Sequence, residues 1–160
     1  MTTIRISWLG ALALAAGLLG WVTNWWMSRN GFPTPVLHLS SLFTLAAIVV
    51  VTLVLGMRVN RWRNGERKRM LDPLLATRTL VLSQATAYAG ALILGWHLGI
   101  LLDQVALVSV RSTLVPVWSS VALIAGGIVM IVVGVLVEGF CRLPPDDDGG
   151  GQEANEGEYA

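Results

Sequence analysis

The sequence is short of charged residues, which occupy only 13% of its 160 positions. Soluble domains carry about 25% charged residues, so the composition argues against a fold surrounded by water. Hydrophobic residues account for 54% of the chain and favour a protein that lies in a membrane. The basic residues stand between apolar runs rather than on one face of a soluble domain, which argues against a nucleic-acid partner.

Residues that carry chemistry are also scarce. Cys141 is the single cysteine, so the chain has no internal disulfide and no second thiolate for a cysteine-based metal site. The sequence contains no HExxH, GxSxG, Walker or dinucleotide-binding motif. We therefore expect no enzymatic activity, no bound cofactor and no catalytic residue.

What the chain does contain is four long apolar segments. The predicted spans cover residues 6–28, 36–57, 74–102 and 116–138. Each has at least the roughly 20 residues that a helix needs to cross a bilayer core, and the runs are continuous rather than alternating, which favours helices over barrel strands. The sequence predicts an all-α membrane protein whose four-helix transmembrane domain occupies residues 1–142. The first span also resembles a cleaved signal peptide, but we favour an uncleaved signal-anchor helix because its basic n-region is weak.

One loop holds six of the eleven basic residues. They are Arg58, Arg61, Arg63, Arg67, Lys68 and Arg69. Positively charged loops stay on the cytoplasmic side, so this loop and both termini are predicted to lie inside. That orientation places nine basic residues inside and two outside. We expect a multi-pass protein of the plasma membrane whose loop contacts anionic lipid headgroups.

The third span carries a ladder of small residues spaced by four. Its members are Ser83, Ala87, Ala91, Gly95 and Gly99. Such a ladder lets a second helix approach closely. A polar stripe at heptad spacing lies on the same span and comprises Thr79, Ser83, Thr86, Gly90 and His97. The stripe fits either hydrogen bonds between helices or a solute path. We favour the bonds because the stripe carries no charge. Leu82, Leu92 and Ile100 are predicted to face lipid.

Two small groups of titratable residues are candidate sites. His38, His97 and Asp103 fall near the outer ends of the second and third spans, and together they would form a weak metal or proton-responsive site. We favour the alternative in which the histidines bond to backbone or water. At the inner ends, Glu138 is placed to pair with Arg142 or Arg78, and we expect a structural role for this pair.

The chain ends in an acidic tail. Residues 143–160 read LPPDDDGGGQEANEGEYA, in which two prolines stop the helix and almost nothing apolar follows. A segment of this composition cannot bury enough surface to fold, so the tail is predicted to be disordered. The predicted orientation places it in the cytoplasm, on the same side as the basic loop.

Two stretches of the sequence resemble a known family. They are LDPLLATRTLVLSQATAYAGALILGWHLG, residues 71–99, and EGFCRLPPDDD, residues 138–148. Both are similar to an actinobacterial family of small four-span membrane proteins, the domain-of-unknown-function 3180 family. The resemblance implies the same four-span architecture and supplies no catalytic or ligand-binding residue.

The functional prediction follows from this architecture. We expect a structural or accessory component of the cell envelope whose partners are the lipid bilayer and other membrane proteins or further copies of itself. The alternative is a subunit of a small oligomeric transporter or channel. A proton-coupled carrier would need an acidic residue at mid-membrane, and the four spans contain none there.

Overall fold

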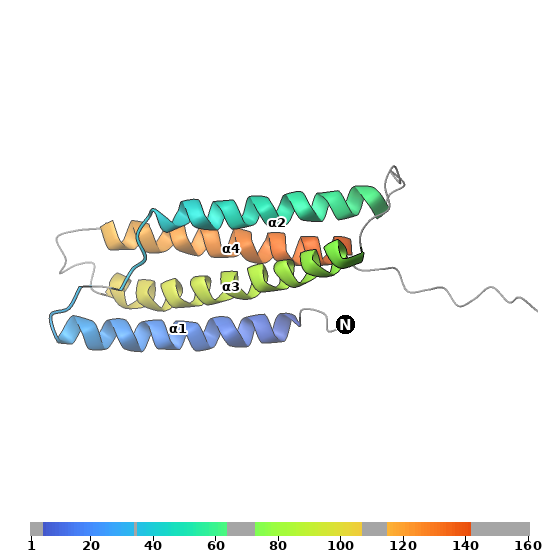
Figure 1. Ribbon diagram of the computed structural model, residues 1–160. Coiled ribbons are helices and arrows are strands. Elements are labelled where there is room, and N and C mark those ends of the chain that lie inside the picture. Colours follow the sequence, from blue (N-terminus) through green and yellow to red (C-terminus); the bar gives the residue numbers. More distant parts are fainter. Residues whose placement is uncertain (1–4, 34, 64–72, 107–114, 142–160) are drawn as a thin grey trace, which may run out of the picture.

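The fold is described from a computed structural model, which defines residues 5–33, 35–63, 73–106 and 115–141. The described residues form four helices and no strand (Figure 1). The helices are α1 (Ile6–Arg29), α2 (Ser41–Arg63), α3 (Pro73–Ala106) and α4 (Val115–Cys141). All four are long and apolar enough to cross a membrane. The predicted all-helical fold with four candidate spans is therefore confirmed.

Two helix boundaries differ from the ends of the predicted spans. α2 begins at Ser41 rather than at residue 36, and the Ser41 hydroxyl donates a hydrogen bond to the His38 carbonyl 2.6 Å away. α3 continues to Ala106, beyond the predicted end at residue 102. The prediction ended the third span at Asp103 because of its charge. However, a helix continues through a charged residue when that side chain finds a partner, as Asp103 does.

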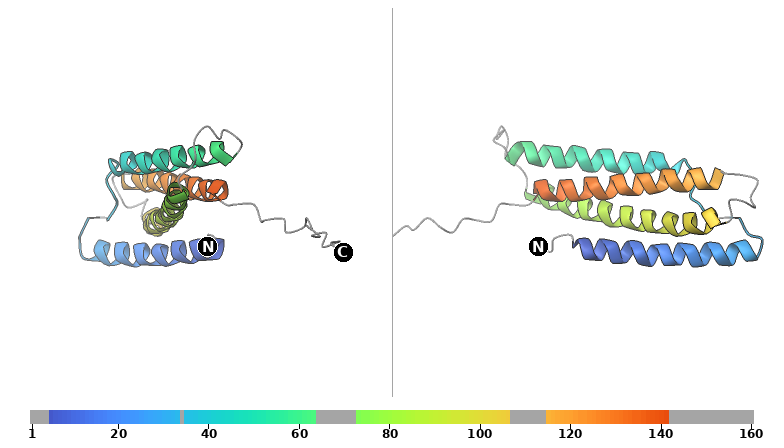
Figure 2. Two further views of the ribbon diagram at one scale, coloured as in Figure 1. Left: turned by 45° about the vertical axis from the view of Figure 1, so that its right-hand side comes forward. Right: turned by 180° about the vertical axis from the view of Figure 1, so that it is seen from behind.

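The helices are arranged around α3. α3 packs against α1 on one side and α4 on the other, while α2 packs mainly against α4 (Figures 1 and 2). Among the described helices, α1 contacts α3 alone. α1 and α3 run in the same direction, and α2 and α4 run in the opposite direction (Figure 1). The attachment of α1 to the bundle thus depends on a single helix–helix interface.

Close backbone contacts explain why α3 is central. A Cβ atom added to Gly95 would fall on the Ala13 carbonyl oxygen of α1, and one added to Gly99 would fall on the Gly17 carbonyl oxygen. On the opposite side, a Cβ atom on Gly90 would lie 2.7 Å from the Gly127 carbonyl oxygen of α4. Small residues permit these distances, and the resulting dispersion contacts hold helices together in lipid.

The small-residue ladder serves two interfaces. All five of its members are buried. Ser83 and Ala87 meet Gly134 of α4, whereas Gly95 and Gly99 meet α1. Residues spaced by four advance about 40° around a helix of 3.6 residues per turn, so a ladder of this length winds from one side to the other. α3 therefore uses the N-terminal half of the ladder for α4 and the C-terminal half for α1.

The polar stripe of α3 is also buried. The Thr86 hydroxyl lies 3.1 Å from the Thr52 hydroxyl of α2, so a hydrogen bond links these two helices at mid-span. The prediction that Ile100 faces lipid is wrong, because Ile100 is 0% exposed while Leu92 is 45% exposed. Leu92 belongs to the part of α3 that the neighbouring helices leave exposed, as do Val81 and Leu98.

Replacement of Gly95 by alanine tests the α1–α3 contact. We expect Gly95→Ala to lower the free energy of unfolding by about 1–3 kcal/mol, because the added methyl group must displace backbone rather than a flexible side chain. Gly10→Ala is the matched control on the facing helix, since no atom lies within 4 Å of a Cβ at Gly10. Thermal unfolding in a mild detergent measures both variants, and equal midpoints would contradict close backbone packing at Gly95.

Candidate functional site

Buried polar residues gather where α1 and α3 end and α4 begins, and this end of the bundle is called the outer end below. Asn24, His97, Gln104 and Ser120 lie there and are almost fully buried. They come from α1, α3 and α4. Polar groups inside a membrane protein are costly unless paired, so a group of them marks the position where function is first sought.

His97 is the one histidine of this polar group. Its Nδ1 donates a hydrogen bond to the Ile93 carbonyl 2.9 Å away on the same helix. A neutral imidazole with the proton on Nδ1 has an unprotonated Nε2, which is a hydrogen-bond acceptor. That Nε2 atom is buried and has no hydrogen-bond partner within the described chain. The backbone bond fixes the orientation of the ring and leaves its second nitrogen unpaired.

His38 lies apart from helical structure. It is exposed in the segment before α2, although the predicted second span, residues 36–57, included it. The described residues contain no group of three or more His, Cys, Asp or Glu side chains that could hold a metal ion. The structure therefore does not bring His38, His97 and Asp103 together as a set of metal ligands.

Asp103 instead connects α1 and α3. The Asn24 amide nitrogen donates a hydrogen bond to the Asp103 carboxylate, with the two atoms 2.5 Å apart. The sequence prediction did not consider Asn24. An amide side chain within an apolar span was the available signal, because such a group requires a partner on another helix. This bond fixes the outer end of α1 against α3.

Ser120 belongs to the same polar group by register. Ser83 lies opposite Gly134 and Gly90 lies opposite Gly127, so each step of seven along α3 matches a step of seven back along α4. The next step places Ser120 opposite His97. Several polar atoms of this group are buried without hydrogen-bond partners among the described residues. They are the Ser120 hydroxyl, both polar atoms of the Gln104 side chain and the side-chain oxygen of Asn24.

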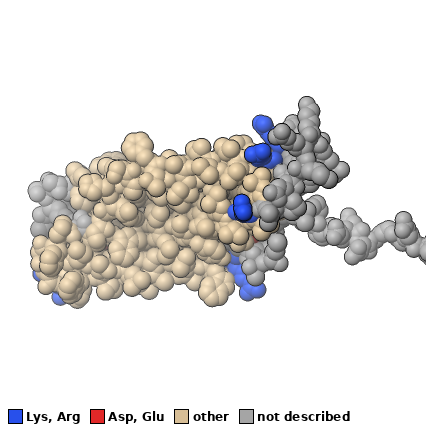
Figure 3. Space-filling model, viewed as in Figure 1, with Lys and Arg blue, Asp and Glu red and all other residues tan. Residues whose placement is uncertain are grey.

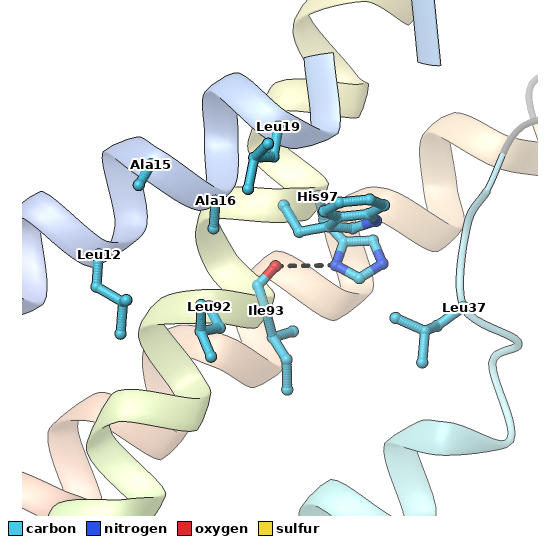
Figure 4. Close-up of a pocket in the computed structure, with 9 residues that line it drawn as sticks. Leu12, Ala15, Ala16, Leu19, Leu37, Leu92, Ile93 and His97 are labelled. Carbon is cyan, nitrogen blue, oxygen red and sulfur yellow. Dashed lines mark hydrogen bonds between the residues drawn. The ribbon is translucent and has the colours of Figure 1, made fainter. Parts of the chain in front are cut away.

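An apolar pocket adjoins this polar group (Figure 4). Its volume is about 430 Å³, which is within the usual range for ligand pockets. The lining comes from α1, from α3 and from the segment before α2: Leu12, Ala15, Ala16, Leu19, Leu37, Leu92, Ile93, Trp96 and His97. The Trp96 indole nitrogen donates a hydrogen bond to the Pro35 carbonyl 3.3 Å away, which holds the segment containing Leu37 beside the pocket.

The basic residues lie at the ends of the helices. Arg58 and Arg61 are exposed near the end of α2, and Arg63 is the last residue of that helix. Figure 3 shows Lys and Arg at both ends of the visible face, with an uncharged surface between them. Arg29 lies at the outer end, with its guanidinium carbon 4.1 Å from the centre of the Trp25 ring. The other members of the predicted loop cluster, Arg67, Lys68 and Arg69, are outside the described residues.

The candidate ion pair at the inner end is only partly described. Glu138 is 6% exposed near the end of α4, and Arg78 is exposed in the first third of α3. Arg142 and the predicted tail, residues 143–160, are outside the described residues. The pairing of Glu138 with an arginine therefore stays a prediction.

Removal of the Asp103 carboxylate tests the Asn24–Asp103 bond. Asp103→Leu should lower the free energy of unfolding by about 1–3 kcal/mol, because it leaves a buried amide without a partner. The double variant Asn24→Leu with Asp103→Leu should recover most of this loss, since neither partner then remains. Thermal midpoints in detergent distinguish the cases. Additive losses in the double variant would show that the two side chains act independently.

Comparisons with known proteins address the family. The sequence model of the family described as "Protein of unknown function (DUF3180)" matches residues 9–145, a range that includes all four helices except the first three residues of α1. No curated protein matches the chain, and no solved structure matches it either. The match covers most of the 160 residues, so this chain belongs to the DUF3180 family of proteins of unknown function.

Proposed function

We propose that this protein is a multi-pass plasma-membrane protein with both termini in the cytoplasm, and that it acts as a structural or accessory component of the cell envelope. The proposed structural or accessory role rests on one observation, the close packing of the bundle interior at mid-span. The proposal includes no enzymatic activity.

The distribution of basic residues supports the orientation. Arg5, Arg58, Arg61 and Arg78 are exposed and lie toward the inner end of their helices, whereas Arg29 lies at the outer end. Cytoplasmic ends of membrane helices carry the excess of Lys and Arg. The described arginines thus show the same bias as the whole sequence, in which nine basic residues fall inside and two outside under this orientation.

The packing at mid-span favours a structural role over transport by a single chain. Ala87, Ala91 and Met130 are buried with at most 1% of their surface exposed, and Gly90 meets Gly127 backbone to backbone. These residues separate His97 and Ser120 at the outer end from Glu138 at the inner end. A polar solute therefore has no continuous polar path between α3 and α4 within the described residues.

The position of α1 favours an accessory role. α1 contacts only α3 among the described helices, and Leu14 and Leu18 on its surface are 72% and 64% exposed. A membrane helix attached along one side leaves the rest of its surface to lipid or to a helix of another protein. The alternative, a transporter or channel subunit, would use the same surface for contacts between copies of this chain.

The orientation predicts the behaviour of C-terminal fusions. A fluorescent-protein fusion should be bright, and an alkaline-phosphatase fusion should be inactive, because both reporters would stay in the cytoplasm. Fusions after Gly31, in the predicted outer segment, are the matched controls and should show the opposite pattern. An active phosphatase at the C-terminus would reverse the proposed orientation.

Photo-crosslinking from the surface of α1 tests the accessory role. A photoreactive amino acid at Leu14 or Leu18 should capture a discrete membrane-protein partner in intact cells, whereas the same group at buried Ala87 should capture none. Mass spectrometry of the crosslinked band identifies the partner. Crosslinks exclusively to further copies of this chain would favour the oligomeric alternative, and crosslinks to lipid alone would contradict both roles.

A further inference from the structure

The pocket between α1 and α3 lies deep in the predicted hydrocarbon layer. On α1 its lining starts at Leu12 and ends at Leu19, six residues after the start of the helix and ten before its end. At 1.5 Å per residue these intervals are about 9 Å and 15 Å along the helix axis. At this depth the material that surrounds a membrane protein is the hydrocarbon of lipid chains.

The lining offers carbon surfaces, and its side-chain nitrogen atoms are either hydrogen-bonded or buried. The side chains are Leu, Ile, Ala and Trp apart from His97 (Figure 4). The His97 Nδ1 is bonded to the Ile93 carbonyl, and its Nε2 is buried beneath other protein atoms. The Trp96 indole nitrogen is bonded to the Pro35 carbonyl. A ligand headgroup would find no partner here, whereas a hydrocarbon chain has no polar group that needs one.

Three separate segments form the pocket, which distinguishes it from an ordinary groove along one helix. Figure 4 shows Leu12, Ala16 and Leu19 of α1 on one side, Leu92 and Ile93 of α3 below them, and Leu37 on the far side. The Trp96–Pro35 hydrogen bond keeps the Leu37 segment in place. A chain held by three segments exchanges more slowly with bulk lipid than a chain that lies against a single helix.

We propose that this pocket is a binding site for one acyl chain of a membrane phospholipid. The chain fills the space beside the α1–α3 interface and contacts Ala15 and Leu19 on one helix and Leu92 on the other. Because α1 contacts only α3 among the described helices, the bound chain adds a second set of contacts that hold α1 to the bundle. The headgroup extends toward the outer end of the helices, where the interfacial layer lies.

A substitution that fills the pocket tests the proposal. Ala15 is exposed and lines the pocket, so Ala15→Phe places a ring in the cavity without displacing backbone. Ala11→Phe is the matched control, one turn earlier on the same exposed face and outside the lining. Native mass spectrometry of protein extracted from membranes in a mild detergent measures the fraction of chains that retain a phospholipid.

We expect a retained phospholipid in the wild type and in Ala11→Phe, and an occupancy lower by about tenfold in Ala15→Phe. Equal occupancy in the two variants would overturn the proposal. So would wild-type protein that carries no phospholipid or only detergent. A folded Ala15→Phe protein, shown by an unchanged helical circular-dichroism spectrum, is required for the comparison.

A second measurement locates the chain directly and does not depend on a variant. A phosphatidylethanolamine with a diazirine at the middle of one acyl chain is incorporated into nanodiscs with the wild-type protein and photoactivated. Labelling should concentrate on peptides that contain residues 12–19 and 92–97. Even labelling of all four helices would show ordinary lipid contact and overturn a specific site. Neither outcome depends on the orientation or the accessory role proposed above.

Discussion

The structure depends on the close approach of the α3 backbone to two other helices. In lipid no hydrophobic effect drives apolar helices together, so contact area and backbone proximity determine the arrangement. Gly95 and Gly99 provide this proximity toward α1, and Gly90 provides it toward α4. Larger side chains at these positions would separate the helices and remove the interface that holds α1.

The same constraint creates the pocket. α1 contacts only α3 among the described helices, so one side of the α1–α3 pair faces the segment before α2. Leu37 lines that side, the Trp96–Pro35 hydrogen bond holds its segment in place, and the lining of the pocket is apolar. The peripheral position of α1 therefore provides both a lipid-exposed surface and a lateral pocket.

The sequence predicts the spans well because apolar length is a local property, and lipid requires that each span satisfy its own backbone hydrogen bonds. It fails where the outcome depends on interactions that apolar length does not describe. Ser41 bonds locally to the His38 carbonyl where α2 starts, and the burial of Ile100 depends on α3 having partners on both sides. The small residues of α3 were visible in the sequence. Their division between α1 and α4 was not visible, because residues spaced by four gradually rotate around the helix axis and so reach different neighbours. Asn24 was missed because a single polar residue in an apolar span does not identify its partner.

The distribution of buried polar atoms separates the two halves of the bundle. At mid-span, the Thr52–Thr86 hydroxyl pair is satisfied and lies close to glycine and alanine contacts. At the outer end, His97, Gln104 and Ser120 keep polar atoms without partners among the described residues. A buried polar atom that lacks a partner costs about 1–3 kcal/mol, so a group of polar residues of this kind is not what close helix packing alone would favour. Stability therefore accounts for the mid-span packing and does not account for the polar residues of the outer end. These polar residues distinguish the outer end of α3 and α4, next to the proposed lipid-chain pocket, from the closely packed middle of the bundle.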